Sequence, residues 1–297
     1  MSVYKNGNTI VEIREDGTKL RYTPDSEKAA PLYPESIDLK ITNMCTMGCT
    51  MCHEQSTPHG KHGDLHHQLL DSLHPYTELA IGGGDPMSNP YLEPFLIKMK
   101  NKNVICNITV HWFSFMKHRG TLTRWANQGL IHGIGISINE KVPTETIDYI
   151  CNFKNAVVHT IIGIANEDVY KQLADKNLNI LLLGYKTFGR GIRYRTKEAY
   201  NIDINTVWLK ENILKFTDHF RAVCFDNLAI EQLDLKTKMS PEMFNQMYMG
   251  GDGTFTMYVD LVENKYAVSS TSIDRYNINS NNIDDLFANV RNISNAN

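Results

Sequence analysis

The chain has 297 residues, of which 42% are hydrophobic, so it can bury a large core without disulfides or a structural metal. Its net charge of −3 makes a nucleic-acid or anionic-membrane partner unlikely, and its first residues lack the apolar run of a signal peptide. No run of about 18 apolar residues occurs either, so we predict no membrane span and a cytoplasmic, reducing location, where the six cysteines serve as metal ligands or buried thiols.

Residues 1–35 have the pattern of a small N-terminal β element. Turn signals at Asn6-Gly7 and Asp16-Gly17 flank Thr9–Arg14 and Lys19–Tyr22, in which apolar and polar residues alternate. We expect a β-hairpin here. Two roles are open for it: a structural cover for the rest of the fold, or an edge that binds a leader peptide by strand addition.

From Ile37 onward, short β-rich runs alternate with longer helical stretches. This alternation predicts an α/β fold, a partial (β/α)6 TIM-like barrel over residues 36–200, with its working face at the carboxyl ends of the strands. Residues 201–297 are expected to form a C-terminal α/β extension that caps the barrel. The predicted strands are Ile37–Thr42, Leu79–Ile81, Val104–Val110, Ile134–Ile138, Ala156–Ile164 and Ile180–Leu183, and the helices between them are Leu65–Leu73, Tyr91–Lys100, Phe115–Asn127, Glu145–Asn152 and Asp168–Lys176.

Three cysteines follow the first predicted strand in one loop. Cys45, Cys49 and Cys52 are spaced four and three residues apart. This spacing lets three thiolates meet one face of a cubane cluster and leaves the fourth iron without a protein ligand. A zinc site is the alternative, and it requires a fourth ligand, which the adjacent His53 offers.

The C-x-x-x-C-x-x-C motif after the first strand of a β/α series resembles the signature of the radical S-adenosylmethionine (SAM) superfamily. The resemblance covers roughly Ile37 to Tyr185 and implies a [4Fe–4S] cluster on the three cysteines, with SAM chelated to the open iron. In that family, one electron from the cluster cleaves SAM to methionine and a 5′-deoxyadenosyl radical, which abstracts hydrogen from a substrate. A reductant such as flavodoxin or ferredoxin supplies the electron. Met51 occupies the position of the family's usual aromatic residue near the adenine.

Two further strand ends resemble SAM-binding motifs of the same family. Gly83-Gly84-Asp85-Pro86 is similar to the G-G-E-P motif that binds the methionine amino group, with an acid one methylene shorter at Asp85. Ser137 and Asn139 follow the fourth strand, where polar side chains of the family meet the ribose hydroxyls. The alternatives are a simple turn at the glycine motif and strand-end caps at Ser137 and Asn139.

The last two strands of the series resemble the family's adenine-binding positions. The resemblance places Gly163 and Leu183 beside the adenine and makes Lys186 and Arg190 candidates for the SAM carboxylate. A solvated loop is the alternative for these two basic residues.

The remaining features concern the substrate and the number of clusters. His53 and Glu54 adjoin the cysteines and are interpreted as active-site neighbours. Met257–Ser270 resembles the hairpin that opens SPASM-type extensions, but no cysteine follows Cys224, so we predict a single cluster. The favoured substrate is a peptide or protein side chain. A small molecule or nucleoside inside the barrel is the alternative, and a zinc-binding structural or interaction protein is the alternative of another class.

The other three cysteines are isolated in sequence within apolar runs. We therefore interpret Cys106, Cys151 and Cys224 as buried thiols that bind no iron.

Overall fold

The computed structural model describes residues 2–15, 18–24 and 27–296, so the predicted turn at Asp16-Gly17 lies outside the described residues. The N-terminal element is a three-stranded antiparallel sheet in the order β1 (Ser2–Asn6), β2 (Thr9–Ile13) and β3 (Lys19–Tyr22). The prediction of a hairpin missed β1, the first strand of this sheet.

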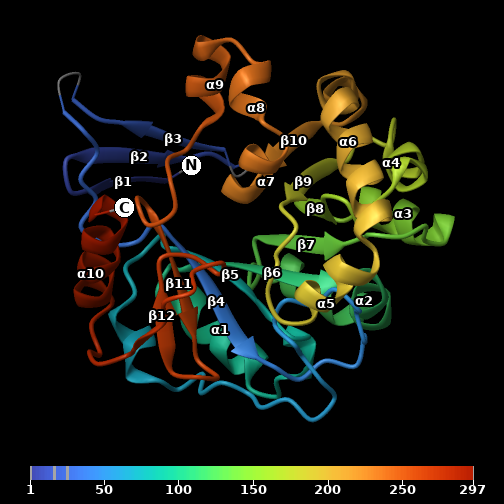
Figure 1. Cartoon of the computed structure of the whole chain (residues 1–297). Helices are drawn as coiled ribbons and strands as arrows, with labels where there is room; N and C mark the ends of the chain where they lie inside the picture. Colours follow the sequence, from blue (N-terminus) through green and yellow to red (C-terminus); the bar gives the residue numbers. More distant parts are fainter. Residues whose placement is uncertain (1, 16–17, 25–26, 297) are drawn as a thin grey trace.

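The main sheet consists of ten strands, and its central part confirms the predicted βαβ series (Figure 1). Each of its first six strands pairs in parallel with the next one along the chain. They are β4 (Ser36–Thr42), β5 (Glu78–Gly83), β6 (Ile105–His111), β7 (Gly133–Ser137), β8 (Ala156–Ile161) and β9 (Asn179–Leu183). The helices that follow β5 to β8 are α1 (Leu92–Asn101), α2 (Trp112–Asn127), α3 (Thr144–Cys151) and α4 (Glu167–Leu173).

The helix predicted for Leu65–Leu73 is wrong. That segment holds only a short 3-10 turn, Gln68–Ser72, although its leucines are buried as a helix would bury them. The His67 side chain accepts a hydrogen bond from the Leu69 amide, a local bond that competes with helix formation, and Pro75 follows closely.

The C-terminal residues add strands to both edges of the sheet. After α5 (Arg190–Lys197) and α6 (Ala199–Phe216), β10 (Ala222–Phe225) pairs in parallel with β9. Three short helices lead to the opposite edge: α7 (Asn227–Gln232), α8 (Leu235–Lys238) and α9 (Pro241–Met247). There β11 (Thr256–Asp260) lies parallel to β4 and forms the predicted hairpin with β12 (Lys265–Ala267), followed by β13 (Tyr276–Asn277) and α10 (Ile283–Ala296). No helix in the described part of the chain is long and apolar enough to cross a membrane.

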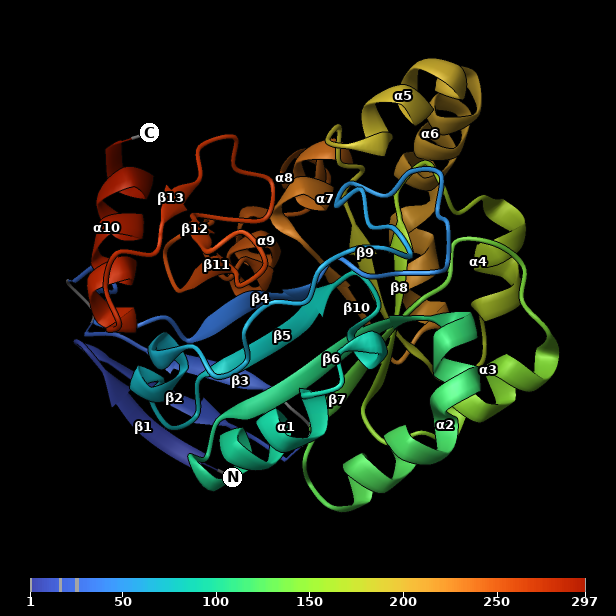
Figure 2. The ribbon, with the colours of Figure 1, turned by 90° about the horizontal axis from the view of Figure 1, so that it is seen from below.

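Alternation along the strands separates the core from an open concave face. In β4, Ile37, Leu39 and Ile41 are buried against the outer layer of helices, whereas Asp38 and Lys40 point to the other side of the sheet. Figure 2 shows this curved sheet from below, with the helices α2, α3 and α4 on its outer side. Polar side chains are therefore collected on the inner face of the partial barrel.

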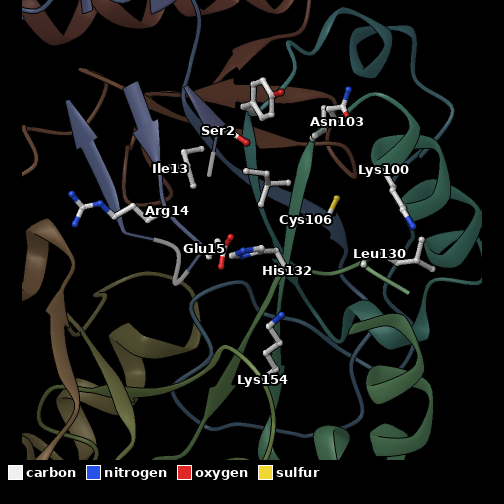
Figure 3. Close-up of a pocket in the computed structure, with 14 residues that line it drawn as sticks. Ser2, Ile13, Arg14, Glu15, Lys100, Asn103, Cys106, Leu130, His132 and Lys154 are labelled. Carbon is white, nitrogen blue, oxygen red and sulfur yellow. The ribbon is translucent and has the colours of Figure 1, made fainter. Parts of the chain in front are cut away.

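A pocket of about 450 Å³ lies at the amino ends of the parallel strands, between the N-terminal sheet and the barrel. Figure 3 shows Glu15, His132 and Lys154 among the residues that line it. The cysteine loop follows the carboxyl end of β4, so this pocket lies at the other end of the barrel from it. Barrel enzymes place their chemistry at the carboxyl ends, and we assign this pocket no part in the candidate site.

Candidate functional site

The three cysteines lie in the loop that leaves the carboxyl end of β4. Backbone hydrogen bonds fix the base of this loop: the Cys45 amide donates to Thr57 O over 2.9 Å, and the Asn43 amide donates to Lys61 O over 2.7 Å. The next loop is attached to it, because the Asp85 amide donates to Met44 O over 2.8 Å. The cysteine loop and the glycine motif are thus held as one unit.

The glycine motif packs tightly on this loop. A Cβ atom at Gly84 would lie 2.3 Å from Met44 O, so only glycine permits the observed approach of the two backbones. Gly83 has a φ of +109°, which glycine adopts without strain. The packing of the two loops therefore requires glycine at both positions, independently of any role in binding SAM.

The three thiols are half-buried, and none of them forms a disulfide. Burial raises the pKa of Cys45, and the nearby Asp85 and Cys52 raise it further. Burial likewise raises the pKa of Cys49, together with the neighbouring thiols of Cys52 and Cys45. Three thiolates in one loop repel one another, and a bound cation would offset that repulsion.

The donor set suits a cluster better than a single ion. Among the described residues, no group of three or more His, Cys, Asp or Glu side chains is arranged to hold one metal ion. The ligands of a cubane bind different irons, so they stand farther apart than the four ligands of a zinc ion. Three thiols in one loop have the chemistry of a [4Fe–4S] site with an open iron, and zinc, which takes four ligands, stays the alternative.

Arg190 organises the cysteine loop from the first turn of α5. Its Nε donates to Cys49 O over 3.1 Å and its Nη1 to Ser56 O over 2.9 Å. The Arg190 amide also donates to Cys52 O over 3.1 Å. These two bonds use two of the five N–H donors of the guanidinium, so Arg190 positions the loop, and its contact with the SAM carboxylate stays a prediction.

Asp85 is held in a defined orientation beside the cysteines. Its Oδ1 accepts from the Met87 amide over 3.2 Å, capping the short 3-10 helix Pro86–Ser88, and its Oδ2 accepts from Ser114 Oγ over 2.8 Å. The carboxylate is close enough to Cys45 to raise the pKa of that thiol. Each oxygen keeps acceptor capacity, so a contact with an ammonium group stays a prediction.

The other predicted SAM-binding residues have varied surroundings. Asn139 Oδ1 accepts a hydrogen bond from the Ile161 amide over 2.7 Å and so secures the end of β8. This bond agrees with the alternative of a strand-end cap. Gly163 has a φ of +79°, and a Cβ atom there would lie 2.7 Å from Ile202 Cγ2, so it packs against α6. The remaining three are half-buried, and their roles stay predictions: Met51 in the cysteine loop, Ser137 at the end of β7 and Leu183 at the end of β9.

A buried ionic network links the cysteine loop to the added strand β11. Lys40 Nζ lies 2.7 Å from Glu54 Oε2 and 3.1 Å from Asp260 Oδ2. Tyr258 OH donates to Glu54 Oε1 over 3.4 Å, and His53 Nε2 lies 3.3 Å from the same oxygen. The role of His53 and Glu54 as active-site neighbours stays a prediction, and their partners Lys40, Tyr258 and Asp260 were not found from the sequence.

Burial and pairing oppose each other in this network. Burial alone would raise the pKa of Glu54, but the hydrogen bond from His53 and the Lys40 ammonium outweigh it and hold that pKa well below its ordinary value. Burial would lower the pKa of Lys40, yet Glu54 and Asp260 raise it. Burial lowers the pKa of His53. At neutral pH, the network is therefore a lysine cation shared by two carboxylates.

The inner face of the sheet carries titratable residues that sequence reasoning did not identify. Neighbouring strands place His111, Ser137, His159, Leu181 and Cys224 in one row, because each is paired in register with the next. Burial lowers the pKa of His159 to about 4, so its imidazole is neutral at pH 7. In the sequence, these inner-face residues could have been recognised as the polar positions of strands in which apolar and polar residues alternate.

The opposite part of the inner face holds a carboxyl group and an amine. Asp38 is exposed on this face, but the protein around its carboxyl group removes part of its hydration and raises its pKa, which the nearby Lys186 partly offsets. Lys186 Nζ donates to Ser270 Oγ over 2.8 Å. Lys186 thus bonds the C-terminal segment, and its predicted contact with the SAM carboxylate stays a prediction.

Two of the remaining cysteines are not buried. Cys106 is buried in β6, but Cys151 at the end of α3 and Cys224 in β10 are exposed. The prediction that these two thiols are buried is wrong, because the end of a helix and an edge strand leave side chains exposed even within an apolar run. The prediction that they bind no iron stays a prediction. Cys224 shares the inner face of the sheet with His159.

Comparisons with known proteins decide the fold. No family model and no curated protein matches the sequence. The structure is similar to SuiB of Streptococcus suis bound to precursor peptide SuiA, with a TM-score of 0.58 and 13% identity, over 88% of this chain and 67% of that chain. A SuiB structure bound to S-adenosylmethionine is similar with a TM-score of 0.42 and 10% identity, over 88% and 68% of the chains.

The chain therefore shares the SuiB fold. This likeness confirms the predicted α/β partial barrel. The spacing of Cys45, Cys49 and Cys52 fits the C-x-x-x-C-x-x-C motif on that fold.

Proposed function

We propose that this chain is a radical SAM enzyme that holds one [4Fe–4S] cluster on Cys45, Cys49 and Cys52. The observation that carries the proposal is the position of the C-x-x-x-C-x-x-C loop, at the carboxyl end of the first parallel strand of a SuiB-like partial barrel. Bound there, the cluster and SAM would supply a one-electron cleavage that yields a hydrogen-abstracting radical.

The protein's own contribution is to position these groups. Arg190 fixes the cysteine loop through the carbonyls of Cys49 and Ser56. Asp85, oriented by Ser114, is proposed to accept hydrogen bonds from the SAM ammonium group. The proposed ribose and adenine contacts lie on the same side of the barrel, at the carboxyl ends of β7 and β9 with Ser137 and Leu183 and in the cysteine loop with Met51.

For the substrate, we propose a peptide or protein side chain on the inner face of the barrel. The SuiB structure that shares this fold was solved with a precursor peptide, which supports the substrate class. The inner face offers a neutral imidazole at His159, a carboxyl group at Asp38 and a thiol at Cys224, all able to bind polar peptide groups. A deuterated small molecule or nucleoside that transfers deuterium to 5′-deoxyadenosine would replace this substrate class.

Reconstitution with iron and sulfide under anaerobic conditions tests the proposed cluster. We expect about four irons and four sulfides per chain, loss of both in Cys49→Ala, and full retention when Cys106, Cys151 and Cys224 are changed to serine. A colourless protein that instead retains one zinc per chain on these cysteines would establish the structural zinc alternative. Deuterated candidate peptides, incubated with SAM and dithionite, then test the substrate by transfer of deuterium to 5′-deoxyadenosine.

A further inference from the structure

The long helix α6 has two apolar faces. On one of them Ile202, Leu209 and Ile213 are buried. Leu209 and Ile213 line a small cavity together with Ile180 of β9, so this face packs against the sheet. The other apolar side chains lie about 180° away around the helix and are exposed to solvent. They are Tyr200, Ile204, Val207 and Leu214, with exposed fractions of 76%, 48%, 54% and 42%.

The exposed apolar residues have the spacing of a coiled-coil seam. They follow one another at intervals of four, three and seven residues, which are the intervals between the two seam positions of a heptad repeat. The exposed Glu211 occupies the remaining seam position. A helix that is apolar on opposite sides is normally buried on both, and Figures 1 and 2 show α6 at the periphery of the barrel. We call Tyr200, Ile204, Val207, Glu211 and Leu214 the α6 seam.

The charges beside the α6 seam favour an antiparallel pairing with a second copy of the same helix. Asp203 and Lys210 precede Ile204 and Glu211 and lie along one flank of the seam. When Ile204 packs opposite Val207 of the second copy, Asp203 lies opposite Lys210 of that copy. Two-fold symmetry makes this ion pair twice. The helix is therefore complementary in charge to itself in this one register.

The same register also accounts for the polar residue of the seam. It sets Glu211 opposite Tyr200 of the second copy, whose hydroxyl can donate to the carboxylate. A parallel pairing would instead set Glu211 opposite Glu211 and Lys210 opposite Lys215, and these like charges repel. The antiparallel arrangement is therefore the one that the sequence of α6 supports.

We propose that the α6 seam is the interface of an antiparallel dimer whose partner is a second copy of this chain. Asp203 Oδ1 already lies 2.6 Å from Arg195, and Lys210 Nζ lies 3.5 Å from Asp234. These side chains are all more than a third exposed, so their pairs extend the new ion pairs and do not block them. The seam faces away from the sheet, which leaves the inner face of the barrel open, and the proposal does not depend on the proposed function.

The size of the interface sets the expected affinity. One helix from each chain buries less surface than a standard interface, so we expect a dissociation constant of about 1–100 µM. Sedimentation velocity of the full-length chain, at concentrations from about 1 to about 300 µM, measures it. Reducing conditions keep the exposed Cys151 and Cys224 from forming disulfides between chains.

A charge in the α6 seam, with a matched control, tests its position. The test variant is Ile204→Glu and the control is Ile97→Glu on α1. The two isoleucines are 48% and 45% exposed on helices, and both substitutions change the net charge equally. Ile204→Glu should raise the dissociation constant at least about tenfold, because it buries an unpaired carboxylate, whereas Ile97→Glu should stay within about twofold of the wild type.

A charge swap tests the antiparallel register. Asp203→Lys alone, or Lys210→Asp alone, places like charges opposite each other twice in the dimer and should weaken it about fivefold or more. The combined variant Asp203→Lys/Lys210→Asp restores opposite charges and should return to within about threefold of the wild type. Thermal unfolding followed by circular dichroism shows that each variant is folded.

Three results would overturn the proposal. A wild type that stays monomeric up to the highest concentration would assign the cover of the α6 seam to a different protein. An equal loss of association in Ile204→Glu and Ile97→Glu would place the contact elsewhere or make it a general effect of charge. A dimer that the combined swap weakens as much as the single substitutions do would refute the antiparallel register.

Discussion

Replacing Lys40 with methionine tests the buried network that attaches the cysteine loop to β11. Methionine preserves most of the volume of the lysine stem but removes the cation between Glu54 and Asp260. The three side chains are 7%, 11% and 7% exposed, so water cannot replace the lost partner. Both carboxylates would remain buried and lie near each other without a counter-ion.

The expected loss is about 3 kcal/mol of unfolding free energy. Removing one partner of a buried ion pair typically costs about 3–5 kcal/mol, and the lower figure applies because Tyr258 and His53 still contact Glu54. The matched control is Lys141→Met. Lys141 lies 3.1 Å from Asp168, but these side chains are 61% and 59% exposed, so the control should lose no more than about 0.5 kcal/mol.

Denaturant unfolding of the metal-free, reduced protein provides the measurement. The additional changes Glu54→Gln and Asp260→Asn should restore part of the stability lost in Lys40→Met, because they remove the unpaired charges. A loss below about 1 kcal/mol in Lys40→Met, or a loss equal to that of Lys141→Met, would refute the reasoning.

The pKa shifts of Glu54 and Lys40 predict how the contribution of their ion pair to the unfolding free energy depends on pH. Because pairing holds the pKa of Glu54 below its ordinary value, its contribution is present above about pH 4.3 and is lost as the pH falls further. The pKa of Lys40 is raised, so its contribution is present below about pH 10.4 and is lost as the pH rises through the pKa of the folded state. In Lys40→Met, burial and mutual repulsion raise the pKa of the two unpaired carboxyl groups, so the difference in stability between wild type and variant should be largest near neutral pH and should shrink as the pH falls and these groups are protonated.

Three further substitutions test individual residues of the site. Gly84→Ala places a Cβ atom 2.3 Å from Met44 O, so we expect lower iron incorporation and a loss of about 1–3 kcal/mol, whereas Gly120→Ala, with open space in α2, should not destabilise. Asp85→Ala should weaken SAM binding by about ten- to a hundredfold in calorimetry with the cluster retained, and unchanged affinity would make Asp85 only a turn residue. His159, with a pKa near 4, remains neutral in the folded state while the unfolded chain takes up a proton below about pH 6.5, so acidification from about pH 7 to 5 should cost about 2 kcal/mol in wild type and clearly less in His159→Gln.

Local patterns in the sequence predicted the features that depend on a few neighbouring residues. The alternation of strands and helices predicted β4 to β9 because apolar residues recur at every second position within a strand. In β4 these are the buried residues Ile37, Leu39 and Ile41. The cysteine loop and the glycine motif were found because their spacing is itself the chemical requirement. The partial barrel followed, since parallel strands joined by helices bring these two loops to one edge of the sheet.

Features that depend on distant residues could not be predicted in this way. The pairing of β11 with β4, and with it the contact of Asp260 with Lys40, joins residues that are 220 positions apart. Arg190 was a candidate for the SAM carboxylate by resemblance, and its hydrogen bonds to the cysteine loop appear only in three dimensions. Burial of Cys224 was expected from its apolar neighbours, whereas its exposure follows from β10 being an edge strand.

The most direct test of the central claim is the formation of 5′-deoxyadenosine from SAM by the reconstituted enzyme. Anaerobic incubation with SAM and dithionite, followed by chromatography, should yield 5′-deoxyadenosine and methionine in equal amounts from the wild type and none from Cys49→Ala. A brown protein with about four irons per chain that produces no 5′-deoxyadenosine above the level of Cys49→Ala, with or without candidate peptides, would contradict the account.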